Sequence, residues 1–194
     1  MTVHILIQCS KSKSVEPSQS LIWDNEMDHN LWNKNWNSSS NRIEVRHLYT
    51  GRAIKSELEV ISSRADFNGY VISAGAGLVS LDDKIPSYEA TFFADDGPDC
   101  QNWSTLPNGG LKNLQINDDD VIVTFAAPIY HRALFADPEF DHQVGTFART
   151  NDVDFFTSWA LAGAVRTGIL IFNLERFIKS CFCIDINLVS GFSG

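Results

Sequence analysis

Short apolar runs bounded by polar stretches dominate the pattern along this chain. Three of these runs are rich in β-branched residues and pass directly into small or polar residues: Val3–Ile7, Tyr70–Ser73 and Val121–Phe125. Runs of this kind are typical of strands that are buried on both faces of a sheet. The pattern predicts that the three segments are neighbouring, mainly parallel strands with helices on both faces, which is an α/β architecture.

Helical and alternating patterns lie between these runs. Gly51 to Arg64 repeats apolar residues along one face, which predicts an amphipathic helix, and Thr50 is its expected N-cap. Ile43 to Tyr49 alternates between apolar and polar residues and predicts a strand. Pro128 is expected to begin a helix, because proline is favoured at the first helical position.

The rest of the chain adds further elements and two long loops. Four more elements are expected after the helix that begins at Pro128. They are a short strand at Phe140–Phe147, a helix that Asp152 or Asp154 caps and that runs to about Val165, a helix at Ile169–Ser180 and a strand at Cys181–Val189. Val15–Ser40 and Ala94–Asp120 are expected to be long loops, the first with a short helix near Leu31, because turn-forming residues dominate them. The 194 residues suit a single α/β domain.

Four tryptophans lie within the two long loops: Trp23, Trp32, Trp36 and Trp103. A long loop that carries aromatic residues is often functional, and a large ring stacks well on a planar ligand. The same rings would equally well pack the loops onto the core. Both interpretations stay open at the level of the sequence.

Charge and cysteine spacing narrow the classes of function. The formal net charge of −9 argues against broad, sequence-independent binding to nucleic acid through its phosphate backbone. A local basic groove can still exist on an acidic protein. No cysteine pair has the spacing of a zinc site, so we expect neither a metal nor another cofactor. The chain starts without a charged leader, and no apolar run reaches membrane-spanning length. We therefore expect a cytoplasmic protein with reduced cysteines and no membrane contact.

Polar and titratable residues follow each of the three predicted strands. They are Cys9, Ser10, Lys11 and Lys13 after the first, Ser73, Gly75 and Gly77 at the second, and Tyr130 and His131 after the third. Because ligands bind at the carboxyl edge of such sheets, we expect Ser10, Lys13, Ser73, Gly75 and Tyr130 to line one crevice. Lys13 either holds an anion or, if burial lowers its pKa, acts as a nucleophile. The neighbouring hydroxyls of Ser10, Ser12 and Ser14 favour the first role.

Three carboxylates come shortly after the second strand. Asp82, Asp83 and Glu89 are expected near the same strand end, with Tyr88 beside them. One carboxylate in a partly apolar pocket can act as a nucleophile, as a general base or as a stabiliser of a cationic sugar. The alternative is a solvated acidic turn without a chemical role.

Four pieces of the chain together resemble a family of small bacterial and phage proteins. The pieces are Cys9–Lys13, Leu48–Arg52, Ile72–Leu78 and Ile85–Glu89, where Tyr88-Glu89 stands in place of the family's Tyr-Asp. The first piece is also similar to the lysine motif of archaeosine synthase, in which a lysine attacks a modified deazaguanine base. Cys9 and Lys13 keep the spacing of that motif, and Ser14-Val15 stands where the motif has Pro-Tyr. The wider relatives include base-exchanging transglycosylases and an antiphage DNA glycosylase that removes glucosylated hydroxymethylcytosine.

This resemblance implies an enzyme that hydrolyses the N-glycosidic bond of a modified base in phage DNA and leaves abasic sites. Lys13, Asp82, Asp83 and Glu89 are the candidate catalytic residues. The candidate substrate-binding residues are Cys9, Ser10, Lys11, Arg52, Ser73, Gly75, Gly77, Tyr88, Tyr130 and His131. No obligatory protein partner is expected.

Two alternatives to this function stay open. One is a hydrolase or transferase that acts on a free nucleoside or nucleotide, and the other is a non-catalytic nucleic-acid-binding stress protein. A DNA enzyme should gather its cations on one face. The cations to follow are Lys11, Lys13, Arg42, Arg46, Arg52, Lys55 and Arg132.

Overall fold

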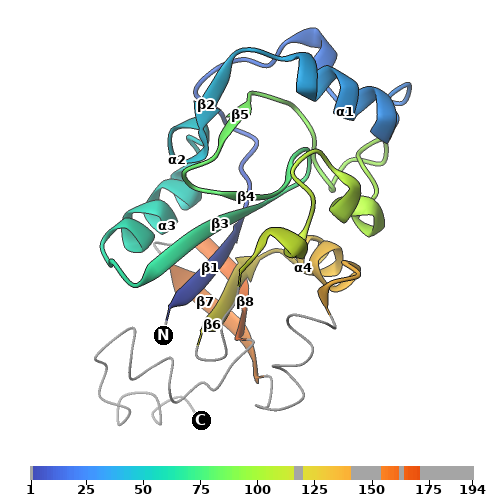
Figure 1. Cartoon of the computed structure of the whole chain (residues 1–194). Coiled ribbons are helices and arrows are strands. Elements are labelled where there is room, and N and C mark those ends of the chain that lie inside the picture. The colour runs from blue at the N-terminus through green and yellow to red at the C-terminus, as the bar shows by residue number, and fades with distance from the viewer. Residues whose placement is uncertain (1, 116–119, 141–153, 162–163, 171–194) are drawn as a thin grey trace, which may run out of the picture.

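A mixed sheet of six strands forms the centre of the fold (Figure 1). The computed structural model describes residues 2–115, 120–140, 154–161 and 164–170. In spatial order the strands are β4 (Gly77–Ser80), β3 (Phe67–Ser73), β1 (Val3–Gln8), β6 (Val121–Ala126), β8 (Ala164–Leu170) and β7 (Asp154–Leu161). β1 pairs in parallel with both β3 and β6, which confirms the prediction for the three central strands. The outer pairings β3–β4, β6–β8 and β7–β8 are antiparallel, so the sheet is mixed rather than mainly parallel.

The central strand β1 is buried on both faces. Ile5, Leu6 and Ile7 are all at most 5% exposed, although successive side chains point to opposite faces. This explains why the strand reads as an unbroken apolar run. The one interruption, His4, has a partner at one ring nitrogen, because its Nε2 lies 3.3 Å from a carboxylate oxygen of Asp120, and its ring packs against Tyr70. Its Nδ1 is buried without a hydrogen-bond partner among the described residues.

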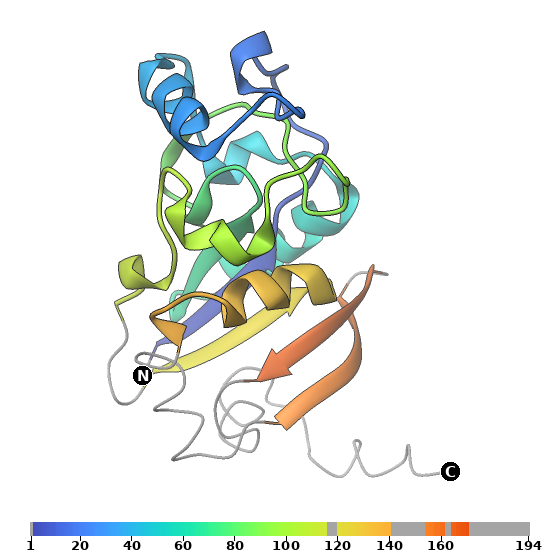
Figure 2. The same cartoon turned by 90° about the vertical axis from the view of Figure 1, so that its right-hand side faces the viewer.

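Helices cover both faces of the sheet, as predicted. Ile61 of α3 (Arg52–Ser62) packs on Gly69 of β3. Gly69 is in register with Ile5 of β1, and Ile5 is in register with Val123 of β6, so all three residues face α3. The next residue of β6, Thr124, therefore points to the opposite face. There it meets α4 (Pro128–Phe135), which begins at the predicted proline and crosses in front of the sheet in Figure 2. The 3₁₀ helix η2 (Cys100–Thr105) packs beside α4.

Several predicted elements differ from those observed. Ile43–Tyr49 is not one strand, because β2 (Arg42–Glu44) is followed by a single turn of helix, α2 (Val45–Leu48). The N-cap of α3 is Gly51 rather than Thr50, because the helix begins one residue later at Arg52, and the amide of Thr50 donates to the carbonyl of Ser12. The helix expected from Asp152 or Asp154 to Val165 is also wrong, because β7 and β8 form an antiparallel hairpin there.

The long loops contain short elements of their own. They include η1 (Gln19–Leu21), the predicted helix near Leu31, which is α1 (His29–Ser38), and η3 (Leu111–Asn113). A small second sheet pairs β2 with β5 (Lys84–Pro86). Apart from Phe140, Ile169 and Leu170, the segments predicted at Phe140–Phe147, Ile169–Ser180 and Cys181–Val189 lie outside the described residues. No helix in the described part is long and apolar enough to cross a membrane.

His131 belongs to the packing between α4 and the sheet, and not to a binding surface. Its side chain is buried, its Nε2 lies 3.2 Å from Oγ1 of Thr124, and its ring stacks on Phe135. The first turn of α4 turns this residue inward, so the substrate-binding role predicted for His131 finds no exposed side chain in the structure. Burial lowers the pKa of His131 to about 4.

A pH-dependent stability follows from this buried histidine. The pKa of His131 in the folded chain lies below its unfolded value of 6.5, so the unfolded chain binds the proton more tightly. The contribution of neutral His131 to the free energy of unfolding is fully present above pH 6.5 and is lost as the pH falls toward about 4. We expect the free energy of unfolding to fall less steeply over this window in His131→Gln, as measured by urea unfolding at several pH values. Parallel slopes for both proteins would contradict this burial of a neutral ring.

Candidate functional site

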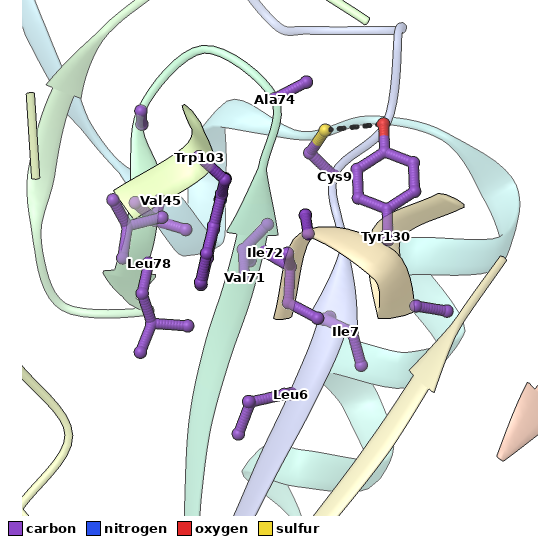
Figure 3. Packing of buried hydrophobic residues seen from close by; sticks show 14 of the residues in the cluster. Leu6, Ile7, Cys9, Val45, Val71, Ile72, Ala74, Leu78, Trp103 and Tyr130 are labelled. Atoms are coloured by element: carbon purple, nitrogen blue, oxygen red, sulfur yellow. Dashed lines mark hydrogen bonds between the residues drawn. The ribbon is translucent and has the colours of Figure 1, made fainter. Parts of the chain in front are cut away.

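The ends of the three central strands are tied together at the carboxyl edge of the sheet. The side-chain oxygen of Gln8 accepts a 2.6 Å hydrogen bond from the amide of Ala127, where α4 begins. The amide of Cys9 donates to the carbonyl of Ile72 on β3 at 3.1 Å. Sγ of Cys9 lies 3.4 Å from the hydroxyl of Tyr130, and Figure 3 shows this contact at the end of β1, above the apolar core. The predicted meeting of strand ends is therefore observed.

Lys13 is held in place by the backbone that surrounds it. The amide of Ser14 donates to the carbonyl of Leu48 at 2.8 Å, and Lys13 forms a β-bridge with Tyr49. Its Nζ lies 4.2 Å from the centre of the Tyr88 ring and 5.8 Å from that of Tyr49. Its hydrogen-bond acceptors are the backbone carbonyls of Ser10 and Lys11, both at 3.4 Å.

The surroundings of Lys13 affect its pKa in opposite directions. Burial lowers the pKa of Lys13 and is the largest effect, while Cys9 and Glu89 oppose it by favouring the charged amine. The net result is a pKa below the ordinary value of 10.5. The sequence pointed to the nearby serine hydroxyls, whereas the contacts of this amine in the structure are aromatic rings and backbone carbonyl oxygens. A partly desolvated lysine of this kind is easier to deprotonate than a surface lysine.

A buried chain of hydroxyl groups fixes the ring beneath Lys13. The hydroxyl of Tyr88 lies 2.8 Å from that of Tyr49 and 2.5 Å from Oγ of Ser73. Oγ of Ser73 also accepts hydrogen bonds from the amides of Gly75 and Ala76, at 3.3 and 2.9 Å. Burial raises the pKa of both Tyr49 and Tyr88, so these phenols stay neutral.

Three residues predicted to bind substrate instead support Lys13. Ser73, Gly75 and Tyr88 are buried, and the hydroxyls of Ser73 and Tyr88 are already engaged. A side chain on Gly75 would lie 2.5 Å from the ring of Tyr88, so the absence of a side chain lets this ring pack under Lys13. Tyr49 is the member of this group that the strand-end argument missed. Its only sequence signal is its place in the second resembling piece, Leu48–Arg52.

Glu89 is the carboxylate that the structure brings to Lys13. Its backbone is pinned to the η1 segment, because its amide donates to the carbonyl of Leu21 and its carbonyl accepts from the amide of Trp23, both at 2.8 Å. Its Oε1 lies 3.4 Å from Nζ of Lys11, and both side chains are exposed. Glu89 is also close enough to raise the pKa of Lys13.

Asp82 and Asp83 lie at the opposite edge of the sheet, so the expectation that all three carboxylates share one strand end is wrong. The reason is the tight turn after β3, which sends β4 back in the antiparallel direction until the amide of Leu81 bonds the carbonyl of Gly69. There Asp82 pairs with Arg46, and Asp83 accepts a 2.8 Å hydrogen bond from the amide of Ser80. The carboxylate of Asp83 thus holds the turn between β4 and β5, and that of Asp82 links this turn to α2.

Of the remaining residues predicted to bind substrate, some lie near Lys13 and one has a structural role. Ser10 packs against Gly51, where any side chain would overlap its hydroxyl, and this contact places the exposed Arg52 next to the loop of Lys13. Gly77 has a positive φ of 94° and packs on the backbone of Gly109, so its role is structural.

The tryptophans are mainly core residues rather than a stacking surface. Trp32, Trp36 and Trp103 are at most 1% exposed, and only Trp23 is partly buried. Two of the indoles hold the turn after β3, because Nε1 of Trp32 donates to the carbonyl of Gly75 at 2.7 Å and Nε1 of Trp103 to that of Ser73 at 3.1 Å. The prediction that all four could stack on a base is thus wrong for three of them.

The candidate cations do not gather on one face. Arg46 pairs with Asp82 at the opposite edge, beside a hollow of about 390 Å³, while Arg42 donates to the carbonyl of Trp36. Lys11, Lys13 and Arg52 are the cations placed at the carboxyl edge by the contacts above. Within the described residues, no group of three His, Cys, Asp or Glu side chains could hold a metal ion.

The site thus combines the partly exposed Lys13 above the ring of Tyr88, the thiol of Cys9 within hydrogen-bonding distance of the Tyr130 hydroxyl, and the carboxylate of Glu89 on an adjacent segment. Its supporting residues are buried, while Lys11, Glu89 and Arg52 are exposed around it. This arrangement offers an amine and a carboxylate to a bound molecule. Comparison of the chain with protein-family models, with curated proteins and with solved structures gives no match.

Proposed function

We propose that this protein hydrolyses the N-glycosidic bond of a modified base in DNA, most relevantly in the hypermodified DNA of phages, and leaves abasic sites. The observation that carries this proposal is a partly buried amine, Lys13, on the ring of Tyr88, with the exposed carboxylate of Glu89 held nearby through Lys11 and near enough to favour the charged amine. An amine and a carboxylate on one surface suit a reaction in which the sugar becomes cationic.

Glu89 has the central role in this proposal. Departure of the base builds positive charge on the sugar, and an exposed carboxylate can stabilise that charge or direct a water molecule onto it. Lys11 is exposed beside it, Arg52 is exposed as well, and both suit contacts to the flanking phosphates. The base must leave the stack before it can react.

The distribution of cations favours a second candidate substrate, a free nucleoside or nucleotide. Arg46 and Lys11 are paired with Asp82 and Glu89, and Arg42 bonds backbone carbonyls. With a net charge of −9, this leaves few cations for a long phosphate backbone. A single nucleoside would need only the edge formed by Lys13 and Glu89.

Incubation with matched substrates tests the proposal and separates the two candidates. The substrates are DNA from phages with ordinary bases, DNA from phages with glucosylated hydroxymethylcytosine, and the corresponding free nucleosides. Mass spectrometry would detect released bases, and an aldehyde-reactive probe would count abasic sites. We expect release from the hypermodified DNA only. Release from nucleosides alone would support the second candidate, and no release from any substrate would contradict both.

A further inference from the structure

We infer that Lys13 captures the aldehyde form of an abasic deoxyribose and links the protein covalently to its product as an imine. This inference rests on the proposed function, because base release is what generates the aldehyde. It adds an activity, the covalent capture of abasic DNA.

The position of the amine is the first argument. Nζ of Lys13 lies over the face of the Tyr88 ring and contacts two backbone carbonyls, and it forms no ion pair with a carboxylate among the described residues. A lysine that serves only to bind phosphate works best as a hydrated point charge at the end of a free arm. Lys11, which is 84% exposed, fits that description, and Lys13 does not.

The rigidity of the platform is the second argument. Tyr88 is fixed through its hydroxyl by Tyr49 and Ser73, and Gly75 leaves room for its ring. An amine resting on such a ring is held in one place while its residue remains partly exposed, so a sugar at the carboxyl edge can reach it. Desolvation also favours the neutral amine, which is the nucleophilic form.

The chemistry balances without any cofactor. The neutral amine of Lys13 adds to C1′ of the ring-opened sugar, and a C–N bond forms. The carbonyl oxygen receives the two protons of the amine nitrogen and leaves as water. The product is a C=N double bond between Nζ and C1′. Water reverses the step and frees the lysine, whereas borohydride delivers hydride to C1′ and makes the link permanent.

A trapping experiment tests the inference without requiring base release. The substrate is a duplex oligonucleotide whose single deoxyuridine has been converted to an abasic site by a separate uracil glycosylase. The full-length protein is incubated with this duplex and sodium borohydride, and adducts are separated on a denaturing gel. We expect a protein–DNA adduct with the wild type and with Lys34→Ala, an exposed lysine on α1, and at least a tenfold loss in Lys13→Arg.

Peptide mapping of the wild-type adduct keeps the test independent of how well a variant folds. Mass spectrometry should place the modified residue at Lys13. Absence of an adduct, or an adduct mapped to other lysines, would overturn the inference. Neither result would touch the proposed base release, which the assay on intact hypermodified DNA measures separately.

Discussion

Replacing Glu89 with glutamine is expected to reduce base release by roughly 100-fold or more, the usual range for loss of a catalytic acid or base. The amide keeps the shape of the side chain and removes its charge, so it can neither stabilise a cationic sugar nor accept a proton from water. Stability should change little, because the carboxylate is exposed and its ion pair with Lys11 lies at the surface. Initial rates of base release and thermal unfolding of the variant would test both parts.

Asp82→Asn is the matched control for this experiment. It makes the same chemical change at a carboxylate on the opposite edge of the sheet, where Asp82 pairs with Arg46. We expect near wild-type base release from this variant. Loss of activity in Asp82→Asn together with full activity in Glu89→Gln would show that the reaction takes place at the edge lined by β4 and not at the ends of the central strands.

Gly77→Ala is expected to destabilise the protein by about 3 kcal/mol, which combines the cost of a left-handed backbone with that of a steric overlap. Gly77 has a φ of 94°, and a side chain there would overlap the carbonyl oxygen of Gly109. The amide of Leu78 bonds that same carbonyl at 2.8 Å, so relief of the overlap would strain this bond. Urea unfolding followed by circular dichroism would measure the loss.

Gly51→Ala provides the comparison for Gly77→Ala. Its φ of −59° suits any residue, and its new side chain would overlap the hydroxyl of Ser10, which can rotate away, and lie 3.1 Å from the Cβ of Ser10. We expect a cost of at most about 1 kcal/mol, since alanine is a poorer N-cap than glycine. Equal losses in the two variants would contradict the strained role assigned to Gly77.

The central strands could be predicted because burial on both faces leaves a simple apolar signature. β1, β3 and β6 lie where the apolar runs stand, and their polar ends meet as expected. The return of β4 was not visible in the sequence, because the small residues after Ser73 suit a ligand-binding turn as well as a tight hairpin. That one turn decides which carboxylates can reach Lys13.

The roles of the aromatic residues could not be assigned from sequence either. Trp32 and Trp103 stand among Asn, Ser and Thr, which suit loops, and the sequence left open whether these rings pack on the core or bind a ligand; both side chains are buried under the turn after β3. Long-range contacts set their positions. In the same way, the residues of β7 become strand through pairing with β8, which overrides the helical pattern expected there.

The central claim is that catalysis takes place around Lys13 at the carboxyl edge of the sheet. The most direct measurement is base release from glucosylated phage DNA by Lys13→Ala, beside the wild type and the exposed-surface variant Lys34→Ala. The account predicts that Lys13→Ala loses most of its activity while it remains folded, and that Lys34→Ala keeps its activity. Full activity in Lys13→Ala would contradict the account and place the site elsewhere on the molecule.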